Sequence, residues 1–319
     1  MEKLLEVKDL KVSFFTDLGE TQAVKDAGFA IEEGDFFGIV GESGSGKSVT
    51  TKSILRLGPS NCRIMGGEIL FQGEDILKKS EAELREIRGG EIAMIFQDSL
   101  SALNPVYTVG NKMVELIRRH TSMTKKEAKV RVLELLTAVG ITDPEKAMRS
   151  YPHELSGGMR QRVMIAMAMS SNPKVLIADE PTTALDVTIQ AQILHLLLEL
   201  QKKNNMSIIL ITHDLGVVAQ TCKRVAVMCG GYVVEEGTVE EIFLNPGHPY
   251  TQALIASMPR VGGTFEQFLE RDLSDGSGNL CPFLNRCKYA DKTCEACLPK
   301  YYESSENHKI LCHRREEEK

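Results

Sequence analysis

Hydrophobic positions along the 319-residue chain follow two patterns, short apolar or alternating runs and longer stretches with a helical period. The short runs predict strands at residues 4–15, 23–31, 36–40, 174–178, 207–212 and 225–228. The helical period predicts helices at residues 49–57, 109–120, 125–139 and 191–201. Strands and helices alternate on either side of a purely helical block, which predicts an α/β fold with a helical insertion.

Changes in the hydrophobic pattern and in composition along the chain predict its division into domains. Residues 1–95 and 163–245 form the predicted α/β core, and residues 96–162 form the helical insertion. Residues 246–280 are expected to be a linker, because the stretch 261–279 is rich in glycine, serine and acidic residues. Residues 281–319 form a predicted small cysteine-rich domain.

Charge and hydropathy exclude some classes of function. The chain has 38 Lys and Arg against 44 Asp and Glu, a net charge of −6, which argues against a protein that wraps nucleic acid. The longest apolar run is seven residues, 163–169, whereas a membrane-spanning helix needs about 20. The charged start of the chain lacks the apolar region of a signal peptide, so we expect a cytoplasmic protein with no transmembrane segment.

The stretch GESGSGKS after the strand-like residues 36–40 matches the P-loop pattern G-x-x-x-x-G-K-[ST] at every fixed position. In such a loop, backbone N–H groups and the following helix N-terminus bind phosphate oxygens. Lys47 would reach the β- and γ-phosphates of ATP, and the Ser48 hydroxyl would bind Mg²⁺. The predicted ATP-binding stretch comprises Gly41, Glu42, Ser43, Gly44, Ser45, Gly46, Lys47, Ser48 and Val49.

A second pair of functional residues ends the apolar strand VLIAD. Asp179 would hold Mg²⁺, mostly through water, and Glu180 would orient or deprotonate the attacking water. Acidic residues at the end of a strand are often only solvated. Beside a P-loop, however, they indicate hydrolysis of a nucleoside triphosphate.

Further motifs follow in a fixed order along the chain. They are Gln97 after the strand-like IAMIF, LSGGMRQR at residues 155–162, PTTALD at residues 181–186, and His213 after SIILIT. With the P-loop, this set resembles the ATP-binding-cassette (ABC) ATPases. The resemblance implies a mixed-sheet, RecA-like core with an antiparallel β subdomain and an inserted helical subdomain.

The resemblance also implies roles for these residues. Two ATPase domains of this family meet head to tail, so Ser156, Gly157 and Gly158 of the signature would bind the γ-phosphate held by the opposite subunit. Gln97 would sense Mg²⁺ and the γ-phosphate, and His213 would contact the γ-phosphate. Asp186 matches the D-loop aspartate.

Other implied roles concern the adenine base and the metal. An aromatic residue of the first strand usually stacks on adenine in this family, and Phe14 is the better match, with Phe15 as the alternative. The resemblance places Ser48, Gln97 and Asp179 around Mg²⁺. Glu180, His213 and Gln97 are the residues expected to serve catalysis.

Three segments, residues 96–105, 176–194 and 245–259, resemble the ATPase subunits of peptide importers, a subfamily that also includes nickel importers. The implied function is an ATP-hydrolysing subunit, peripheral on the cytoplasmic membrane face, that pairs with a second ATPase subunit. A separate transmembrane permease would carry the substrate, and an external peptide-binding protein would select it. The alternatives are a nickel importer and a soluble ABC ATPase of repair or translation. The single cassette and the acidic charge disfavour the soluble alternative.

Five of the eight cysteines lie in the last 39 residues. In a reducing compartment such a cluster indicates metal binding, and four thiolates suit either zinc or an iron–sulfur cluster. His308 and His313 could join a zinc site. The resemblance favours a [4Fe–4S] cluster. Its implied ligands are Cys281, Cys287, Cys294 and Cys312, with Cys297 as an alternative.

Overall fold

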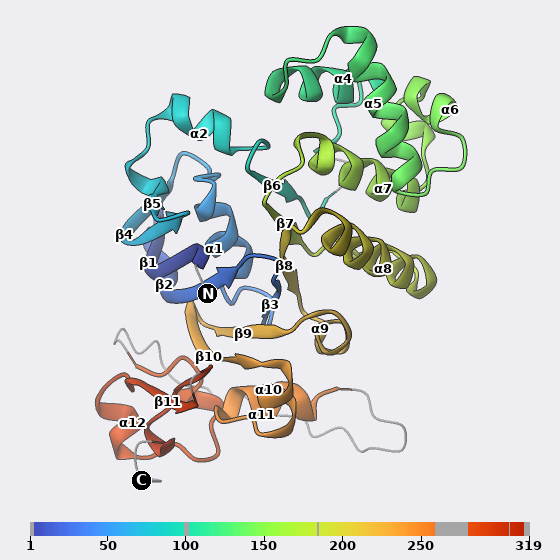
Figure 1. The fold of residues 1–319 in the computed structure, drawn as a ribbon. Coiled ribbons are helices and arrows are strands. Elements are labelled where there is room, and N and C mark those ends of the chain that lie inside the picture. Colours follow the sequence, from blue (N-terminus) through green and yellow to red (C-terminus); the bar gives the residue numbers. More distant parts are fainter. Residues whose placement is uncertain (1–2, 99–101, 184, 259–279, 306, 316–319) are drawn as a thin grey trace. The chain divides into compact units, whose positions relative to one another are not determined.

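A computed structural model describes residues 3–98, 102–183, 185–258, 280–305 and 307–315 (Figure 1). The chain divides into two compact units, which are described separately. Unit 1 contains residues 1–32, 36–77 and 212–319, and unit 2 contains residues 33–35 and 78–211. Most of the expected linker, residues 259–279, lies outside the described residues.

Unit 1 begins with an antiparallel layer of strands. β1 (Lys3–Thr16) pairs with β2 (Gly19–Glu32) on one side and with β4 (Cys62–Phe71) on the other, and β5 (Glu74–Asp75) extends β4. Strands at β1 and β2 were expected from their apolar alternation. β4 was missed, because a glycine pair interrupts its pattern and much of the strand is exposed.

The rest of the unit 1 sheet is mixed. β3 (Phe36–Val40) runs parallel to β9 (Arg224–Cys229), and β10 (Tyr232–Thr238) pairs antiparallel with β9 and parallel with β2. All five residues of β3 are buried, as the sequence predicted. The helices of unit 1 are α1 (Lys47–Ile54), α9 (Leu215–Thr221), α10 (Val239–Leu244), α11 (Pro249–Ala256), α12 (Lys292–Ala296) and the 3₁₀ helices η4 (Leu284–Arg286) and η5 (His313–Arg315).

The cysteine-rich tail is part of unit 1. Its strand β12 (His308–Leu311) pairs antiparallel with β10 and with β11 (Tyr301–Ser305). Phe283 and Leu311 join the buried cluster that contains Tyr250 of α11. The expected separate tail domain therefore extends the sheet and core of unit 1, and the part of the expected linker at α11 is a helix with half of its residues buried.

Unit 2 contains a parallel set of strands and the helical insertion. β7 (Val175–Asp179) lies between β6 (Ile92–Ile95) and β8 (Ser207–Thr212). The helices of unit 2 are α2 (Glu81–Ile87), α4 (Val109–His120), α5 (Lys125–Ala138), α6 (Pro144–Arg149), α7 (Gly157–Ala168), α8 (Val187–Asn204) and the 3₁₀ helices η2 (Pro152–Glu154) and η3 (Met169–Ser171). The 3₁₀ helix η1 (Ile76–Lys78) contains residues of both units.

Helices α4 to α7 of unit 2 pack against one another (Figure 1). Thr124 begins α5 with a capping box, in which its hydroxyl accepts the Glu127 N–H and the Glu127 carboxylate accepts the Thr124 N–H. The expected helices at residues 109–120 and 125–139 are confirmed within one residue.

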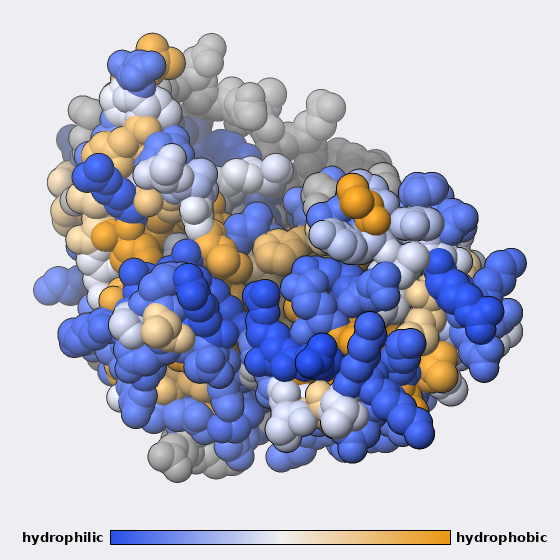
Figure 2. All heavy atoms as spheres, turned by 90° about the horizontal axis from the view of Figure 1, so that it is seen from above, coloured by the Kyte–Doolittle hydropathy of each residue, from blue (hydrophilic) through white to orange (hydrophobic). Residues whose placement is uncertain are grey.

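The surface carries mostly hydrophilic side chains on the face drawn in Figure 2, with hydrophobic residues scattered among them. The exposed apolar side chains include Val106 and Tyr107, just before α4. Over the described ranges, no helix combines the length and hydrophobicity needed to cross a bilayer.

Candidate functional site

The P-loop connects β3 to α1, as its motif predicted. Gly44 and Gly46 have φ angles of 80° and 102°, which favour glycine. A Cβ atom on Gly46 would also lie only 2.7 Å from the carbonyl oxygen of Ala23. The loop therefore needs glycine at this position for both conformation and space.

Lys47 is the first residue of α1 and is 5% exposed. Its Nζ donates to the carbonyl oxygens of Gly41 and Glu42, at 2.8 Å each. The ammonium group is thus held against the loop backbone by neutral acceptors. Phosphate oxygens can replace these carbonyls as acceptors, since a charged acceptor forms the stronger hydrogen bond.

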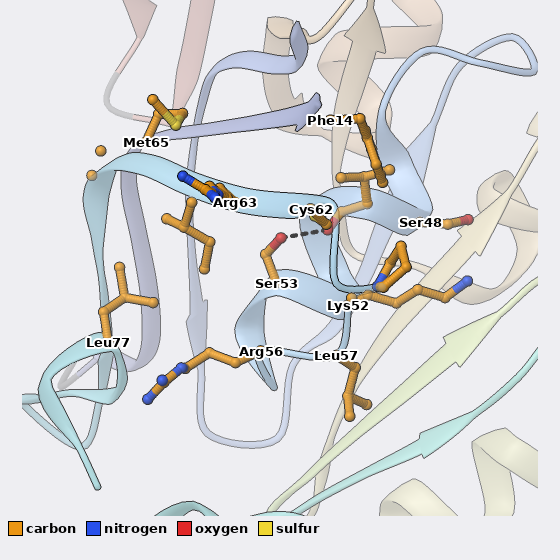
Figure 3. A pocket seen from close by; sticks show the side chains of 16 residues that line it. Phe14, Ser48, Lys52, Ser53, Arg56, Leu57, Cys62, Arg63, Met65 and Leu77 are labelled. Carbon is orange, nitrogen blue, oxygen red and sulfur yellow. Dashed lines mark hydrogen bonds between the residues drawn. The ribbon is translucent and has the colours of Figure 1, made fainter. Parts of the chain in front are cut away.

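Ser48, the next residue, lines a cavity of about 720 Å³ within unit 1. Phe14 lines the same cavity, and the two side chains lie on the same side of it in Figure 3. Lys52, Arg56 and Arg63 add positive charge to its walls. An aromatic ring and a P-loop hydroxyl at one cavity suit a nucleotide, whose base stacks and whose phosphates attract cations.

The alternative aromatic residue, Phe15, has a different environment. The guanidinium carbon of Arg63 lies 5.3 Å from the centre of its ring. In the described part of the chain, Phe15 is not among the residues that line the cavity. Of the two, Phe14 is the one in a position to stack on a base.

Asp179 and Glu180 lie at the carboxyl end of β7 in unit 2. Asp179 is fully buried as the last residue of the strand. Glu180 adopts a left-handed backbone conformation with φ 46°, and its N–H donates to the Ile211 carbonyl at 3.0 Å. Such a conformation costs a non-glycine residue about 1 kcal/mol or more, and strain of this kind is common at active sites.

The Glu180 carboxylate accepts hydrogen bonds from the side chains of Gln97 and Thr183. Gln97 Nε2 and Thr183 Oγ1 each lie 2.8 Å from Glu180 Oε2. The structure therefore brings together Gln97 and Glu180, both of which were predicted from the sequence. Thr183 was missed as a functional residue, although its place in the turn after β7 was a usable signal.

Each unit, taken separately, carries oxygen donors of a kind that a divalent cation binds. Asp179 offers a carboxylate, and Gln97 offers its amide oxygen because its amide nitrogen is bonded to Glu180. In unit 1, Ser48 supplies a hydroxyl at the start of α1. Carboxylate, amide and hydroxyl oxygens are the hard ligands that Mg²⁺ prefers.

The predicted signature lies at the start of α7. Ser156 is exposed, and its hydroxyl caps α7 by accepting the Met159 N–H at 3.3 Å. A Cβ on Gly158 would lie 3.0 Å from Ile189 Cγ2. The cap and the glycines together leave backbone N–H groups at an accessible helix N-terminus, which suits an anion.

Asp186 and His213 complete the motifs named by sequence. Asp186 caps α8 and accepts the Ile189 N–H at 2.9 Å. His213 follows β8 and is exposed, and the next residue, Asp214, caps α9 by accepting the Gly216 N–H at 2.8 Å. Each motif thus ends a strand or begins a helix, where the chain changes direction.

Four tail thiols line one narrow cavity of about 20 Å³ in unit 1: Cys281, Cys287, Cys294 and Cys312. Cys297 is exposed instead, with its Sγ 3.9 Å from His313 Nε2. Burial raises the pKa of Cys281 to about 12, and the neighbouring thiols add to this effect. Burial also raises the pKa values of Cys287, Cys294 and Cys312, so all four thiols are protonated at neutral pH unless a cation stabilises their thiolates.

The metal site expected from the sequence is not found in the described residues, where no group of three or more His, Cys, Asp or Glu side chains is arranged to hold a metal ion. The cavity is too narrow for a cluster as it stands. His308, which was considered for zinc, is buried and bonds to Glu235 at 2.7 Å. The iron–sulfur cluster therefore remains a prediction.

Comparisons with known proteins agree with this geometry. A family model described as ABC transporter matches residues 24–183, and one described as oligopeptide/dipeptide transporter, C-terminal region, matches residues 234–294. The oligopeptide transport ATP-binding protein OppD of Bacillus subtilis (strain 168) is 56% identical over 268 residues, covering 84% of this chain and 75% of the relative. The dipeptide transport ATP-binding protein DppD of the same strain is 49% identical, covering 98% of this chain and 95% of the relative.

A solved structure is similar as well. The dimeric structure of MJ0796, described as a bacterial ABC transporter cassette, matches with a TM-score of 0.66 and 29% sequence identity. The match covers 74% of this chain and 98% of the other.

Proposed function

The chain belongs to the ABC transporter ATPases, as its motifs indicated, and from this membership we propose that it drives the import of oligopeptides or dipeptides. Its hydrolysis of ATP powers a separate transmembrane permease, and the chain lies at the cytoplasmic membrane face. An external peptide-binding protein supplies the substrate. The match of residues 234–294 to the C-terminal region of oligopeptide/dipeptide transporters favours this function over a soluble ABC ATPase.

The observation that best supports ATP hydrolysis is the bond between Gln97 and Glu180. Glu180 accepts a proton from, or orients, the attacking water. The Gln97 amide nitrogen binds Glu180, and its amide oxygen would be left to contact a bound Mg²⁺. Through Gln97, a bound Mg²⁺ would influence the position of the Glu180 carboxylate, which acts on water.

The remaining residues bind and orient ATP. Backbone N–H groups of residues 41–48 and the Lys47 ammonium bind the phosphates, and Phe14 stacks on adenine. Ser48 and Asp179 would hold Mg²⁺, which when bound would supply positive charge to the phosphates. His213 contacts the γ-phosphate.

The working form is a head-to-tail pair of ATPase subunits, either two copies of this chain or this chain with a similar one. Ser156, Gly157 and Gly158 contact the γ-phosphate bound by the opposite subunit, with Asp186 nearby in the D-loop. The exposed cap at Ser156 and the dimeric structure reported for MJ0796 support this arrangement.

A transport assay tests the proposed substrate. Deleting the gene for this chain should abolish uptake of radiolabelled di- and oligopeptides, and the wild-type gene should restore it, whereas a gene for Glu180→Gln should not. Uptake of ⁶³Ni²⁺ serves as the control. Loss of nickel uptake with normal peptide uptake would show that the chain serves a nickel importer.

We propose that the tail thiols bind a [4Fe–4S] cluster, with zinc as the alternative. The support is their chemistry and their shared cavity, since four thiolates are the usual cluster ligands. Binding requires the cavity to widen and the thiols to lose protons. Iron, zinc and sulfide analysis of the anaerobically purified chain decides the assignment. About four irons per chain supports it, and about one zinc, or no metal, refutes it.

A further inference from the structure

The tail contacts the P-loop at Glu42, which is the second residue of the loop. Arg286 forms two hydrogen bonds to its carboxylate, Nη1 to Oε1 at 3.1 Å and Nη2 to Oε2 at 2.9 Å. The backbone N–H of Glu42 donates to the Tyr250 hydroxyl at 2.9 Å. All three residues belong to unit 1, and they join segments that are more than 200 residues apart in sequence.

Arg286 is held in place by aromatic rings. Its guanidinium carbon lies 5.1 Å from the centre of the Phe283 ring and 5.8 Å from that of Tyr250. The two rings contact each other edge to face, with their centres 5.4 Å apart. The Arg286 side chain is 25% exposed. Because the two rings hold its planar guanidinium in place, the group is pre-organised for a bidentate bond.

Glu42 also contacts the lysine that binds phosphate. Its carbonyl oxygen accepts from Lys47 Nζ at 2.8 Å. The position of Glu42 therefore sets the position of one acceptor that Lys47 uses. In addition, a carboxylate in a phosphate-binding loop repels ATP, and the Arg286 cation neutralises that charge.

We propose that Arg286 and Tyr250 are positioning residues for the P-loop, through which the tail sets the affinity for MgATP. Tyr250 fixes the loop backbone at Glu42, and Arg286 fixes and neutralises the Glu42 side chain. Arg286 directly precedes Cys287, so one peptide bond links the residue that holds Glu42 to the cysteine segment. The proposal rests on the ATP-binding function proposed above, and not on the presence of a metal.

Direct binding measurements on the full-length chain test the proposal. The Kd for MgATP is measured with wild type, Arg286→Ala, Glu42→Gln and the double variant. Arg286→Ala should raise the Kd roughly two- to fivefold, the range expected for a partly exposed ion pair. In the Glu42→Gln background the same substitution should change the Kd by less than about 1.5-fold, because no charge is then left to neutralise.

Further variants separate this role from a structural one. Arg286→Lys keeps the charge but loses the bidentate geometry, so it should recover part of the affinity. Tyr250→Phe keeps the ring but removes the acceptor for the Glu42 N–H, and should also raise the Kd. Lys288→Ala is the matched control, since Lys288 is an exposed cation in the same segment that lies 5.1 Å from the Tyr289 ring centre.

Two results would overturn the proposal. The first is an unchanged Kd for MgATP in a folded Arg286→Ala variant. The second is a loss of affinity on Arg286→Ala that is the same in the wild-type chain and in the Glu42→Gln variant. If Arg286→Ala does not fold, Arg286→Lys and Glu42→Gln give the same comparison. A wild-type chain that binds no MgATP would instead refute the proposed function itself.

Discussion

The Gln97 amide nitrogen donates a 2.8 Å hydrogen bond to the Glu180 carboxylate, and this bond joins residues 83 positions apart in sequence. Thr183 donates to the same oxygen, Glu180 Oε2, at 2.8 Å. Both bonds hold the same carboxylate oxygen, so they fix the orientation of the group that is proposed to act on water. The backbone strain at Glu180 indicates that this placement is imposed by the surrounding fold.

Replacing Glu180 by Gln should abolish steady ATP hydrolysis while ATP binding is kept. The amide has nearly the same shape but cannot accept a proton, so we expect kcat to fall by at least about 100-fold. Steady-state hydrolysis and the Kd for MgATP are the measurements. A variant that hydrolyses ATP at a near-normal rate would remove Glu180 from its proposed role.

Thr183→Val should lower kcat by roughly fivefold, because one hydrogen bond to the charged Glu180 is lost. The KM for ATP should change little, since Thr183 acts through Glu180. Thr183→Ser retains the hydroxyl and should restore most of the rate. Equal losses in the Val and Ser variants would assign the effect to packing and not to the hydrogen bond.

The P-loop and the end of β7 could be predicted because each is a local pattern, an apolar run followed by a short motif. The buried strand at residues 36–40 was predicted at its full length for the same reason. In contrast, the bond between Arg286 and Glu42 joins residues 244 positions apart, and no local pattern predicts this contact, although Glu42 lies in the P-loop motif. The tail was expected to form a separate cysteine-rich domain, but it gains a sheet partner in β10 and a place in the unit 1 core, and both are tertiary effects.

Ser156→Arg should block ATP-dependent dimerisation, because it places bulk and charge where the signature meets the opposite subunit's ATP. The measurement is light scattering of Glu180→Gln protein with MgATP, with and without this second change. Loss of the α7 cap also costs about 1 kcal/mol of stability. Thr124→Arg removes the cap of α5 and is the control. Dimerisation that survives in Ser156→Arg would contradict the composite-site proposal.

Stability should fall as the pH is lowered from about 6.5 towards 4, because of His248. Its ring is 1% exposed, and burial lowers its pKa from 6.5 to about 4, although the Glu235 carboxylate acts in the opposite direction. Between these values the unfolded chain binds the proton that the folded chain does not, so protonation favours unfolding. The full difference between the two pKa values corresponds to a loss of at most about 3 kcal/mol in the free energy of unfolding.

His248→Asn provides the matched test. His248 Nδ1 accepts the Tyr250 N–H at 3.0 Å, which caps α11, and an Asn side-chain oxygen can serve as the same acceptor. The variant should therefore keep the cap but lose this part of the pH dependence. Urea unfolding at pH 4.5 and pH 7 measures the effect in both proteins. If the two proteins lose equal stability over this interval, His248 is not the source of the acid sensitivity.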